Sequence, residues 1–370
     1  MKDLMGIITA PENFKYLQDI TADRVVAAVP YGGRYRLIDF ILSNMVNSGI
    51  QNVGLFIGEK SRSLLDHLRS GKDWDLHRKR NGLFILPTDC SSFSGTPMGN
   101  LEYFYKHLDY FHGSTEKYVL IGGSNTIFNT TFNKFFKFHM DNNADVTIIY
   151  SEYPQIDPAN STTLEIDAAN RVIDIKVNPS RKKKSKKISM EIYLMKKELL
   201  MDITDTCVSK GQSDLTKDGI IKNIKNLNVY AYRYTGYFGK VTSLTSYYHH
   251  NMALLNPEIW TELFFESGPI YTKVKNEPPT KYTQSSKVLN SLIASGCIIE
   301  GQVENSILFR GARVFKNSTV KNCILLPRSE IREKAYIHNV ILDKNVCISN
   351  EKILIGDSKH PIYIGKKNVV

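Results

Sequence analysis

A repeat of six residues in the C-terminal part of the chain constrains the fold more strongly than any other feature. From Ser291 onward, aliphatic residues recur near every sixth position; they include Val314, Val320, Leu325, Ile331, Ile337, Val340 and Val346. A period of six fits neither a helix nor a single amphipathic strand. It fits a three-sided parallel β-helix, in which each flat side contributes one inward aliphatic side chain per hexapeptide. The repeat therefore predicts a left-handed parallel β-helix over residues 291–370.

A second strong pattern lies near the N-terminus, in the stretch Val29–Gly49. A Pro-x-Gly-Gly turn is followed by apolar residues at three- and four-residue spacing, which is typical of a helix with one buried face. Gly49 stands where a helix C-cap favours a residue with positive φ. The next apolar run, Val53–Ile57, reads as a buried strand of a parallel sheet. This stretch predicts an α/β domain in the first part of the chain.

Other segments extend this α/β pattern. The segments Met5–Ala10, Tyr118–Phe128 and Asp145–Tyr150 contain apolar, strand-like runs. A single amphipathic helix is expected over Leu101–Phe111, and another over residues 129–142. In the second helix, the residues expected to face the core are Phe132, Phe135, Phe136 and Met140.

The chain of 370 residues is long enough for two domains, each with its own core. Four prolines, at 257, 269, 278 and 279, mark a connector between them. We therefore expect a first domain over residues 1–256, a connector over 257–290 and the β-helix over 291–370.

Three global features bear on where such a protein works. No run of about 18 apolar residues is present, which argues against a membrane span. The N-terminus lacks the apolar core of a signal peptide. The five cysteines are scattered and show no metal-binding spacing. These features favour a cytoplasmic protein with reduced thiols.

The net charge of +11 depends strongly on one basic run, Arg181–Lys187. This run carries six positive charges and leaves +5 for the rest of the chain. No aromatic residue interrupts it, so it lacks the usual pattern of a nucleic-acid-binding segment. A solvated loop is the simplest interpretation, and contact with an anionic partner or effector remains an alternative.

The sequence motifs resemble those of the sugar-1-phosphate nucleotidyltransferases, and most closely the ADP-glucose pyrophosphorylases. In that family F-G-G-K-F-R-I-I-D-F-x-L-S-N-x-x-N-S-G follows the nucleotide loop, and the present chain has Y-G-G-R-Y-R-L-I-D-F-I-L-S-N-M-V-N-S-G. Further matches are S-M-E-I-Y, G-Y-F-G-K-V and P-P-T-K-Y. The resemblance covers nearly the whole chain. It implies a Rossmann-like nucleotidyltransferase domain with a mixed, mostly parallel sheet, followed by the β-helix.

The same resemblance reveals losses at the family's nucleotide and metal positions. The glycine-rich loop is replaced by a segment without glycine, in which Tyr16 stands at an arginine position. Val26 replaces the lysine that handles substrate phosphates. Asn125 and Lys240 replace the two aspartates that hold Mg²⁺. An ammonium group would repel this ion, so we do not expect the family's Mg²⁺, or any other cofactor, to be bound here.

Further departures fall on the sugar-phosphate side of the family's site. Val177 and Asn178 replace the glutamate and lysine that bind glucose 1-phosphate, and Glu191 replaces a glycine. The Gly-Thr pair of the family's Y-x-G-T-A loop is retained. The resemblance therefore implies a vestigial ligand pocket, with the lining residues Gly95, Thr96, Asn125 and Lys240.

Nucleotidyl transfer depends mainly on neutralising and aligning phosphates. A complete scaffold without those groups predicts a regulatory-type subunit of an ADP-glucose pyrophosphorylase that is inactive, or very weakly active, alone. The resemblance implies a catalytic partner subunit in a heterotetramer, and a phosphorylated metabolite as effector. Neither nucleic acid nor a membrane is expected as a partner.

The sequence leaves three alternative functions open. One is a slow, atypical nucleotidyltransferase that is active alone, and another is a scaffold or exchange-factor-like subunit of the same architecture. The third, a hexapeptide acyltransferase, requires a catalytic histidine at a coil edge, and the repeats contain only His338.

Overall fold

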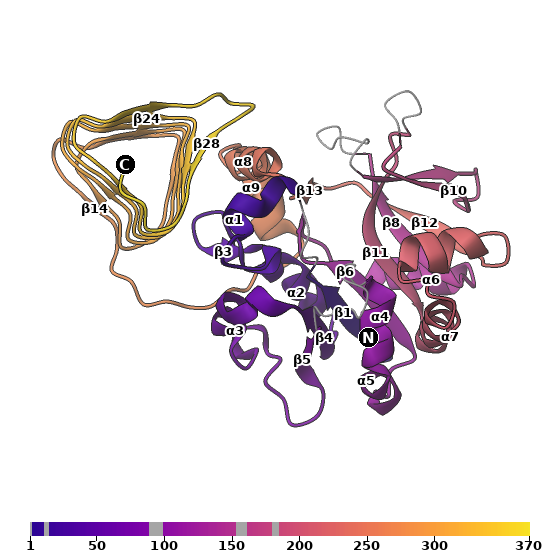
Figure 1. Ribbon diagram of the computed structural model, residues 1–370. Coiled ribbons are helices and arrows are strands. Elements are labelled where there is room, and N and C mark those ends of the chain that lie inside the picture. The colour runs from indigo at the N-terminus through magenta and orange to yellow at the C-terminus, as the bar shows by residue number, and fades with distance from the viewer. Residues whose placement is uncertain (1, 11–14, 89–98, 153–160, 180–184) are drawn as a thin grey trace.

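The computed structural model describes residues 2–10, 15–88, 99–152, 161–179 and 185–370. An α/β domain and a triangular β-helix lie side by side, with helix α8 (Leu244–Ala253) close to their boundary (Figure 1). Both elements of the expected fold class are therefore confirmed.

The α/β domain is built on a nine-stranded mixed sheet. Its main path runs β10-β9-β11-β6-β1-β4-β5, and β8 and β12 extend it from β11. The four strands from β6 to β5 are parallel, whereas β11 runs antiparallel to β6 and β8. The strands are β1 (Leu4–Thr9), β4 (Asn52–Ile57), β5 (Gly82–Pro87), β6 (Tyr118–Gly123), β8 (Val146–Ser151), β9 (Thr162–Ile166), β10 (Val172–Val177), β11 (Ile188–Lys196) and β12 (Val229–Tyr234).

Helix α2 (Leu37–Asn47) is the buried helix that the N-terminal pattern predicts. Its carboxylate at Asp39 accepts a hydrogen bond from the Arg36 backbone N–H at 3.0 Å, which closes the first turn. Gly49 has φ +79, as expected after a helix C-terminus. Other helical segments are η1 (Lys15–Leu17), α1 (Gln18–Thr21), η2 (Val26–Ala28), α3 (Arg62–Leu68), α4 (Asn100–Lys106), α5 (Leu108–Gly113), α6 (Asn133–Asp141), α7 (Lys197–Val208) and α9 (Pro257–Thr261).

Two expectations about helices were wrong in detail. The helix expected over Leu101–Phe111 is divided into α4 and α5, because His107 leaves the helical region (φ −121, ψ 32) and its ring contacts the Pro87 carbonyl at 2.8 Å. Met140 is exposed and lies outside the core. The buried stripe of α6 instead contains Phe135 and His139, whose ring bonds to the Thr147 hydroxyl at 2.7 Å.

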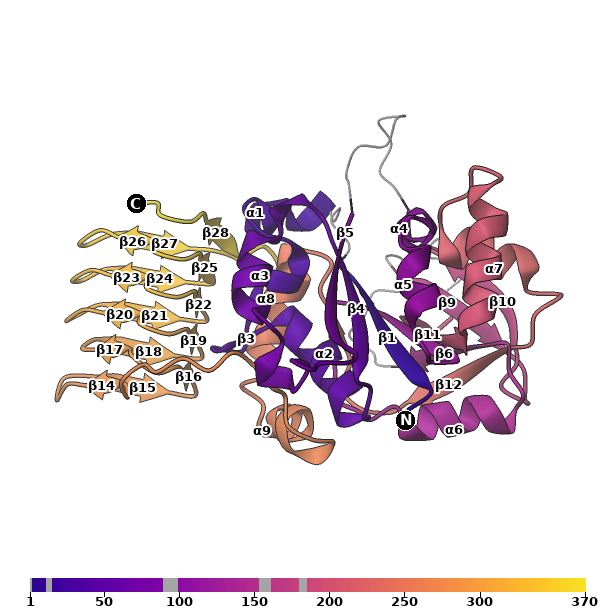
Figure 2. The same cartoon turned by 90° about the horizontal axis from the view of Figure 1, so that it is seen from below.

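The β-helix consists of three parallel five-stranded sheets, seen as five stacked coils in Figure 2. All seven aliphatic residues that defined the six-residue repeat are at most 1% exposed, so the inward positions are confirmed. The sheets contain β14 (Lys281–Tyr282), β17 (Ile298–Ile299), β20 (Arg313–Val314), β23 (Glu330–Ile331) and β26 (Cys347–Ile348); β15 (Lys287–Leu289), β18 (Gln302–Glu304), β21 (Thr319–Lys321), β24 (Tyr336–His338) and β27 (Ile353–Ile355); and β16 (Leu292–Ile293), β19 (Ile307–Leu308), β22 (Ile324–Leu325), β25 (Val340–Leu342) and β28 (Ile362–Ile364).

The coils begin before residue 291, since β14 and β15 lie within the segment 257–290 and already pair with β17 and β18. Strand residues of the third sheet, such as Ile324, join an apolar cluster with residues of the α/β domain. Tyr248 of α8 adds a hydrogen bond from its hydroxyl to the Asn322 carbonyl at 2.8 Å. Apolar packing and hydrogen bonding thus hold the β-helix against the α/β domain.

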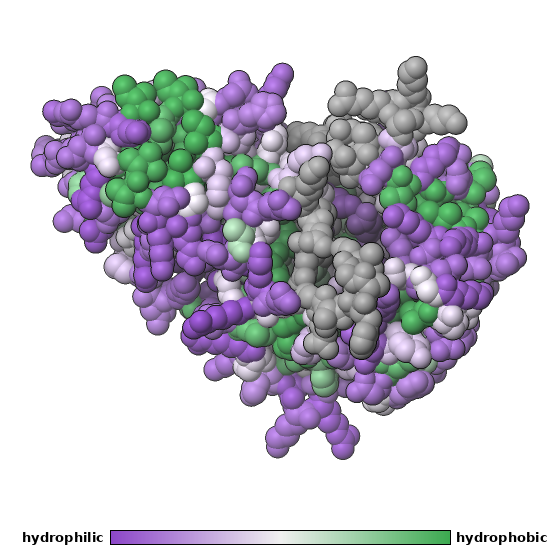
Figure 3. Space-filling view, in the orientation of Figure 1, coloured by the Kyte–Doolittle hydropathy of each residue, from purple (hydrophilic) through white to green (hydrophobic). Residues whose placement is uncertain are grey.

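Hydrophilic side chains cover much of the face seen in Figure 3, and a hydrophobic patch lies over the β-helix. Exposed aliphatic residues of the last coil include Ile353 and Ile355. Within the described ranges, no helix is long and apolar enough to cross a membrane.

Candidate functional site

The two positions at which the family resemblance implies metal-binding aspartates lie next to each other in the fold. The short strand β7 (Thr126–Ile127) pairs with β13 (Gly239–Lys240), and Thr126 is opposite Lys240. Asn125 Nδ2 donates to the Val241 carbonyl at 3.2 Å, and the Val241 N–H donates back to the Asn125 carbonyl at 2.8 Å. The Asn125 side chain therefore serves as a structural link between these strands.

Lys240 is buried, and its ammonium nitrogen lies 2.7 Å from Oε1 of Glu191. Glu191 stands in β11 at an irregularity of the pairing with β8, and its φ is +56. The Thr162 hydroxyl donates a longer hydrogen bond to the same carboxylate oxygen, at 3.3 Å. We call the group Asn125, Thr162, Glu191 and Lys240 the crevice cluster.

The sugar-phosphate positions border this cluster. Val177 is half-buried and pairs with Thr162 across β9 and β10. Asn178 is exposed, adopts φ +49, and its backbone N–H donates to the Ser161 carbonyl at 3.1 Å. The structure thus brings four of the predicted positions, Asn125, Val177, Asn178 and Lys240, into one neighbourhood.

The remaining predicted positions differ in their surroundings. Val26 in η2 is 2% exposed and shares an apolar cluster with Ile127 and Val241. The lysine position of the family has therefore become part of a core. Tyr16 is largely exposed on η1. Gly95 and Thr96 lie outside the described residues, so the four-residue pocket expected from the sequence stays a prediction.

The side chains at the two metal positions do not fit a divalent cation. Asn125 Oδ1 faces Gly123, where an added Cβ would lie 3.0 Å from it, and its amide nitrogen donates to a carbonyl. At the other position an ammonium replaces a ligand and would repel the ion. Among the residues that the structure describes, no three His, Cys, Asp or Glu side chains gather in a way that could hold a metal.

A second site, which the sequence did not predict, lies between the α/β domain and the β-helix. It is a cavity of about 490 Å³. Its wall contains the cationic residues Arg34, Arg36, Arg62, Lys273, Lys275, Arg310, Lys344 and Lys366, and the carboxylates Asp23 and Asp66. We call it the basic cavity.

Positive charge in the basic cavity is poorly balanced. Of its eight cations, only Lys366 forms an ion pair with a carboxylate in the described part of the chain, with Asp23 at 3.7 Å. Burial, with the nearby Arg36 and Arg24 guanidiniums, lowers the pKa of the Lys344 ammonium to about 7. Burial also lowers the pKa of Arg36 to about 10. A bound anion would relieve this repulsion, so the cavity is suited to a ligand with phosphate groups.

Local structure places the cations at the cavity. Gly32 and Gly33, at φ +57 and +81, form the turn between β2 (Pro30–Tyr31) and β3 (Tyr35–Arg36). This turn carries Arg34 to the cavity wall. Asn251 of α8 accepts a hydrogen bond from the Gly32 N–H at 3.0 Å, which fixes the turn.

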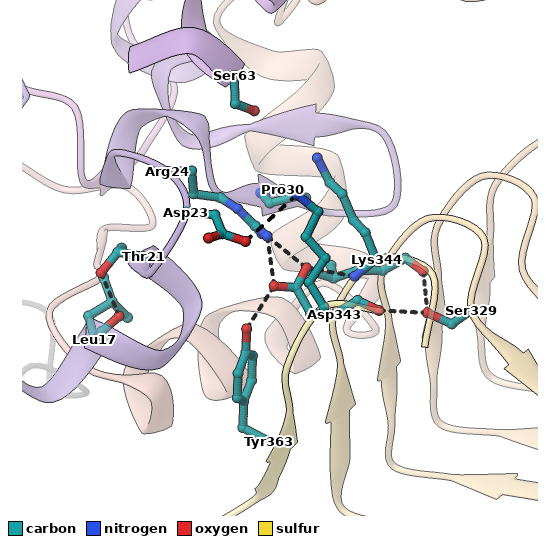
Figure 4. A network of polar contacts seen from close by, with 12 residues as sticks. Leu17, Thr21, Asp23, Arg24, Pro30, Ser63, Ser329, Asp343, Lys344 and Tyr363 are labelled. Atoms are coloured by element: carbon teal, nitrogen blue, oxygen red, sulfur yellow. Dashed lines mark hydrogen bonds and ion pairs between the residues drawn. The ribbon is translucent and has the colours of Figure 1, made fainter. Parts of the chain in front are cut away.

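On the β-helix side, Asp343, the residue before Lys344, forms a buried ion pair with Arg24 (Figure 4). Arg24 Nη2 lies 2.6 Å and 2.9 Å from the two carboxylate oxygens of Asp343. The Tyr363 hydroxyl donates to the same carboxylate at 2.7 Å. Both charged side chains are 3% exposed, so this pair forms a dry contact between the two domains.

Sequence reasoning missed this cavity because its cations come from distant segments. Arg34 and Arg36 lie in the motif Y-G-G-R-Y-R. Nothing in the sequence showed that Arg310 and Lys344 of the β-helix would line the same cavity. Sequence reasoning also identified the changes at Glu191 and Lys240 separately, but it did not predict that the two side chains form an ion pair.

Comparisons with known proteins agree with this architecture. Residues 15–256 match the family model described as nucleotidyl transferase, and residues 278–360 match a GlmU-like C-terminal hexapeptide model. The chain is 38% identical over 363 residues to glycogen biosynthesis protein GlgD of Bacillus subtilis (strain 168), covering 98% of this chain and 96% of that protein.

Two further relatives extend the comparison. Glycogen biosynthesis protein GlgD of Geobacillus stearothermophilus is 37% identical over 318 residues, covering 86% of this chain and 82% of that protein. Glucose-1-phosphate adenylyltransferase of Pseudothermotoga lettingae is 30% identical over 380 residues, covering 100% of this chain and 90% of that protein. The similarity spans both domains in each case.

Proposed function

Because this chain belongs to the nucleotidyl transferase family, and within it to the glycogen biosynthesis protein GlgD group, we propose that it is a regulatory subunit in glycogen biosynthesis. It forms a hetero-oligomer, expected to be a heterotetramer, with a catalytic glucose-1-phosphate adenylyltransferase subunit. It modulates that partner's conversion of glucose 1-phosphate and ATP to ADP-glucose and pyrophosphate. Alone, it has negligible activity.

The observation that carries this proposal is the use of both metal positions for internal contacts. Asn125 links β7 to β13, and Lys240 pairs with Glu191. Phosphoryl and nucleotidyl transfer depend on metal ions and cationic groups that neutralise charge on the reacting phosphates. With Val26 in an apolar cluster, the phosphate-binding lysine is absent as well. These contacts favour a structural or regulatory role over catalysis.

The basic cavity supports the regulatory part of the proposal. Most of its cations form no ion pair in the described part of the chain, which suits a phosphorylated metabolite. Its walls belong to both domains, since Arg36 and Arg310 lie on opposite sides of the boundary. An anion bound there would contact both domains at once and would therefore favour one arrangement of the pair. We propose that this shift changes the surface that the chain presents to the catalytic subunit, and thereby changes partner activity.

The test combines this chain with the catalytic subunit from the same cell. We expect light scattering after size exclusion to show a hetero-oligomer, and the partner's maximal rate or its response to phosphorylated metabolites to change. Arg310→Ala with Lys344→Ala should abolish the effector response contributed by this chain without preventing assembly. The matched control, Lys287→Ala with Lys316→Ala, removes two exposed β-helix cations outside the cavity and should leave the response intact.

Two results would contradict the proposal. One is a mixture that remains as separate species with unchanged partner kinetics. The other is a turnover of roughly 1–100 per second by this chain alone, which is the range of ordinary enzymes.

A further inference from the structure

In the ion pair between Glu191 and Lys240, the carboxylate stands at a position where the family resemblance implies a glycine. Glu191 adopts φ +56 within β11, a conformation that glycine takes readily and that residues with a Cβ take rarely. Such strained positions persist where the surrounding structure stabilises them, and they gather at binding sites. The contacts of Glu191 are the 2.7 Å pair with the Lys240 ammonium, the hydrogen bond from the Thr162 hydroxyl, and a hydrogen bond from its own backbone N–H to the Ser189 hydroxyl at 3.0 Å.

The two partners differ in their access to solvent. The Lys240 side chain is 6% exposed, whereas that of Glu191 is 38% exposed. A buried ammonium needs a compensating anion, because an isolated charge is strongly disfavoured away from water. The carboxylate of Glu191 supplies that anion from the solvent side.

We propose that the crevice cluster is a latent anion site, which the chain closes with its own carboxylate. Glu191 occupies the place beside Lys240 that a ligand phosphate would otherwise take. Removing this carboxylate, without restoring any metal ligand, creates a site that binds phosphate groups independently of Mg²⁺. This inference goes beyond the regulatory role and does not depend on the basic cavity.

Geometry around the pair supports exchange of one anion for another. The Thr162 hydroxyl already donates to Glu191 Oε1 at 3.3 Å and could donate to a phosphate oxygen placed there. The β11 irregularity aims Glu191 toward Lys240, which is the usual effect of a bulge on side-chain direction. A cation and a hydroxyl donor would therefore face the incoming anion.

The experiment uses the full chain carrying Arg310→Ala and Lys344→Ala, so that binding in the basic cavity is suppressed in every sample. Inorganic pyrophosphate is titrated by calorimetry in the presence of EDTA. We expect Glu191→Gln to bind pyrophosphate at least about tenfold more tightly than its parent, since the change removes one repelling charge and frees the ammonium. Adding Lys240→Met should remove the gain.

Two further variants make the test decisive. Glu191→Gly removes the carboxylate and also accepts the positive φ, so it covers the case in which Glu191→Gln folds poorly. Glu304→Gln breaks a comparable 2.8 Å pair with Lys321 on the β-helix and should give no gain. Pyrophosphate should raise the thermal midpoint of the Glu191 variants only while Lys240 is present.

The proposal is overturned if neither Glu191 variant binds more tightly than the parent, or if the gain survives Lys240→Met. Because Arg310 and Lys344 are replaced in every sample, neither outcome bears on the effector role of the basic cavity.

Discussion

The crevice cluster and the basic cavity treat charge in opposite ways. In the crevice, the buried Lys240 has a carboxylate at 2.7 Å, so its charge is balanced within the chain. In the cavity, eight cations face two carboxylates, and the pKa of Lys344 is lowered to about 7. In the crevice cluster a carboxylate of the chain balances the buried ammonium, whereas in the basic cavity an external anion would reduce the repulsion between cations. The proposed loss of catalysis and the proposed binding of an anion thus concern different parts of one scaffold.

The largest expected effect concerns catalysis at the crevice. Asn125→Asp with Lys240→Asp restores both carboxylates implied by the family, yet Val26, Val177 and Asn178 remain. We expect synthesis of ADP-glucose by this variant alone to stay at least about 10³-fold below an ordinary turnover of roughly 1–100 per second. A coupled pyrophosphate assay with Mg²⁺ measures it. Substantial rescue would contradict the expectation that the other replaced positions also limit catalysis.

A second prediction compares balanced and unbalanced charge at the domain boundary. Asp343→Asn leaves the buried Arg24 guanidinium without its carboxylate, so we expect the free energy of unfolding to fall by about 3–5 kcal/mol. Arg310→Gln removes a cation from a repelling group and should be neutral or stabilising. Urea unfolding measures both changes. Equal destabilisation by the two variants would contradict the charge difference described above.

An exposed pair provides the control for Asp343→Asn. Glu351→Gln breaks the 2.8 Å contact with Lys334 on the surface of the β-helix. Solvent and salt screen such pairs, so the urea midpoint should be unchanged.

A smaller effect is expected from protonation of Lys344. Its pKa in the folded chain, about 7, lies below the ordinary value of 10.5. A bound anion favours the charged ammonium, so binding in the cavity should take up protons near and above pH 7. Affinity should fall as the pH rises, by at most about tenfold per unit from this group. Pyrophosphate calorimetry in buffers of different ionisation enthalpy measures the uptake.

The variant Lys344→Met isolates that contribution, because the ionisation of pyrophosphate itself is common to both proteins. The same proton uptake in Lys344→Met would assign it to another group. Without ligand, the effect of pH is opposite: the contribution of Lys344 to the free energy of unfolding rises with pH. The folded chain binds fewer protons at Lys344 than the unfolded chain between about pH 7 and 10.5, so this residue contributes rising stability across that window.

Much of the fold followed from local patterns in the sequence. The six-residue repeat identified inward residues such as Val314 and Ile337, because each coil buries one side chain per flat side. The helix expected around Phe135 also formed, but its stripe was misjudged at Met140, since a polar residue, His139, occupies the buried position through its bond to Thr147. Polar residues inside a core weaken the hydrophobic signal on which such predictions depend.

The candidate sites were less predictable, for a different reason. Motif comparison located Asn125 and Lys240, but the effect of each change depends on a partner from another strand, such as Glu191. The basic cavity forms only when the β-helix docks on the α/β domain, which brings Arg310 near Arg36. Contacts between distant segments are set by tertiary packing, and no local pattern encodes them.

The stoichiometry of pyrophosphate binding to the otherwise unaltered chain, measured by calorimetry with EDTA, tests most directly whether the basic cavity is the anion site of this protein. We predict one pyrophosphate per chain, lost in Arg310→Ala with Lys344→Ala and unchanged in Lys240→Met. Binding that survives the cavity changes but disappears with Lys240→Met would place the anion site in the crevice cluster and contradict the role proposed for the basic cavity.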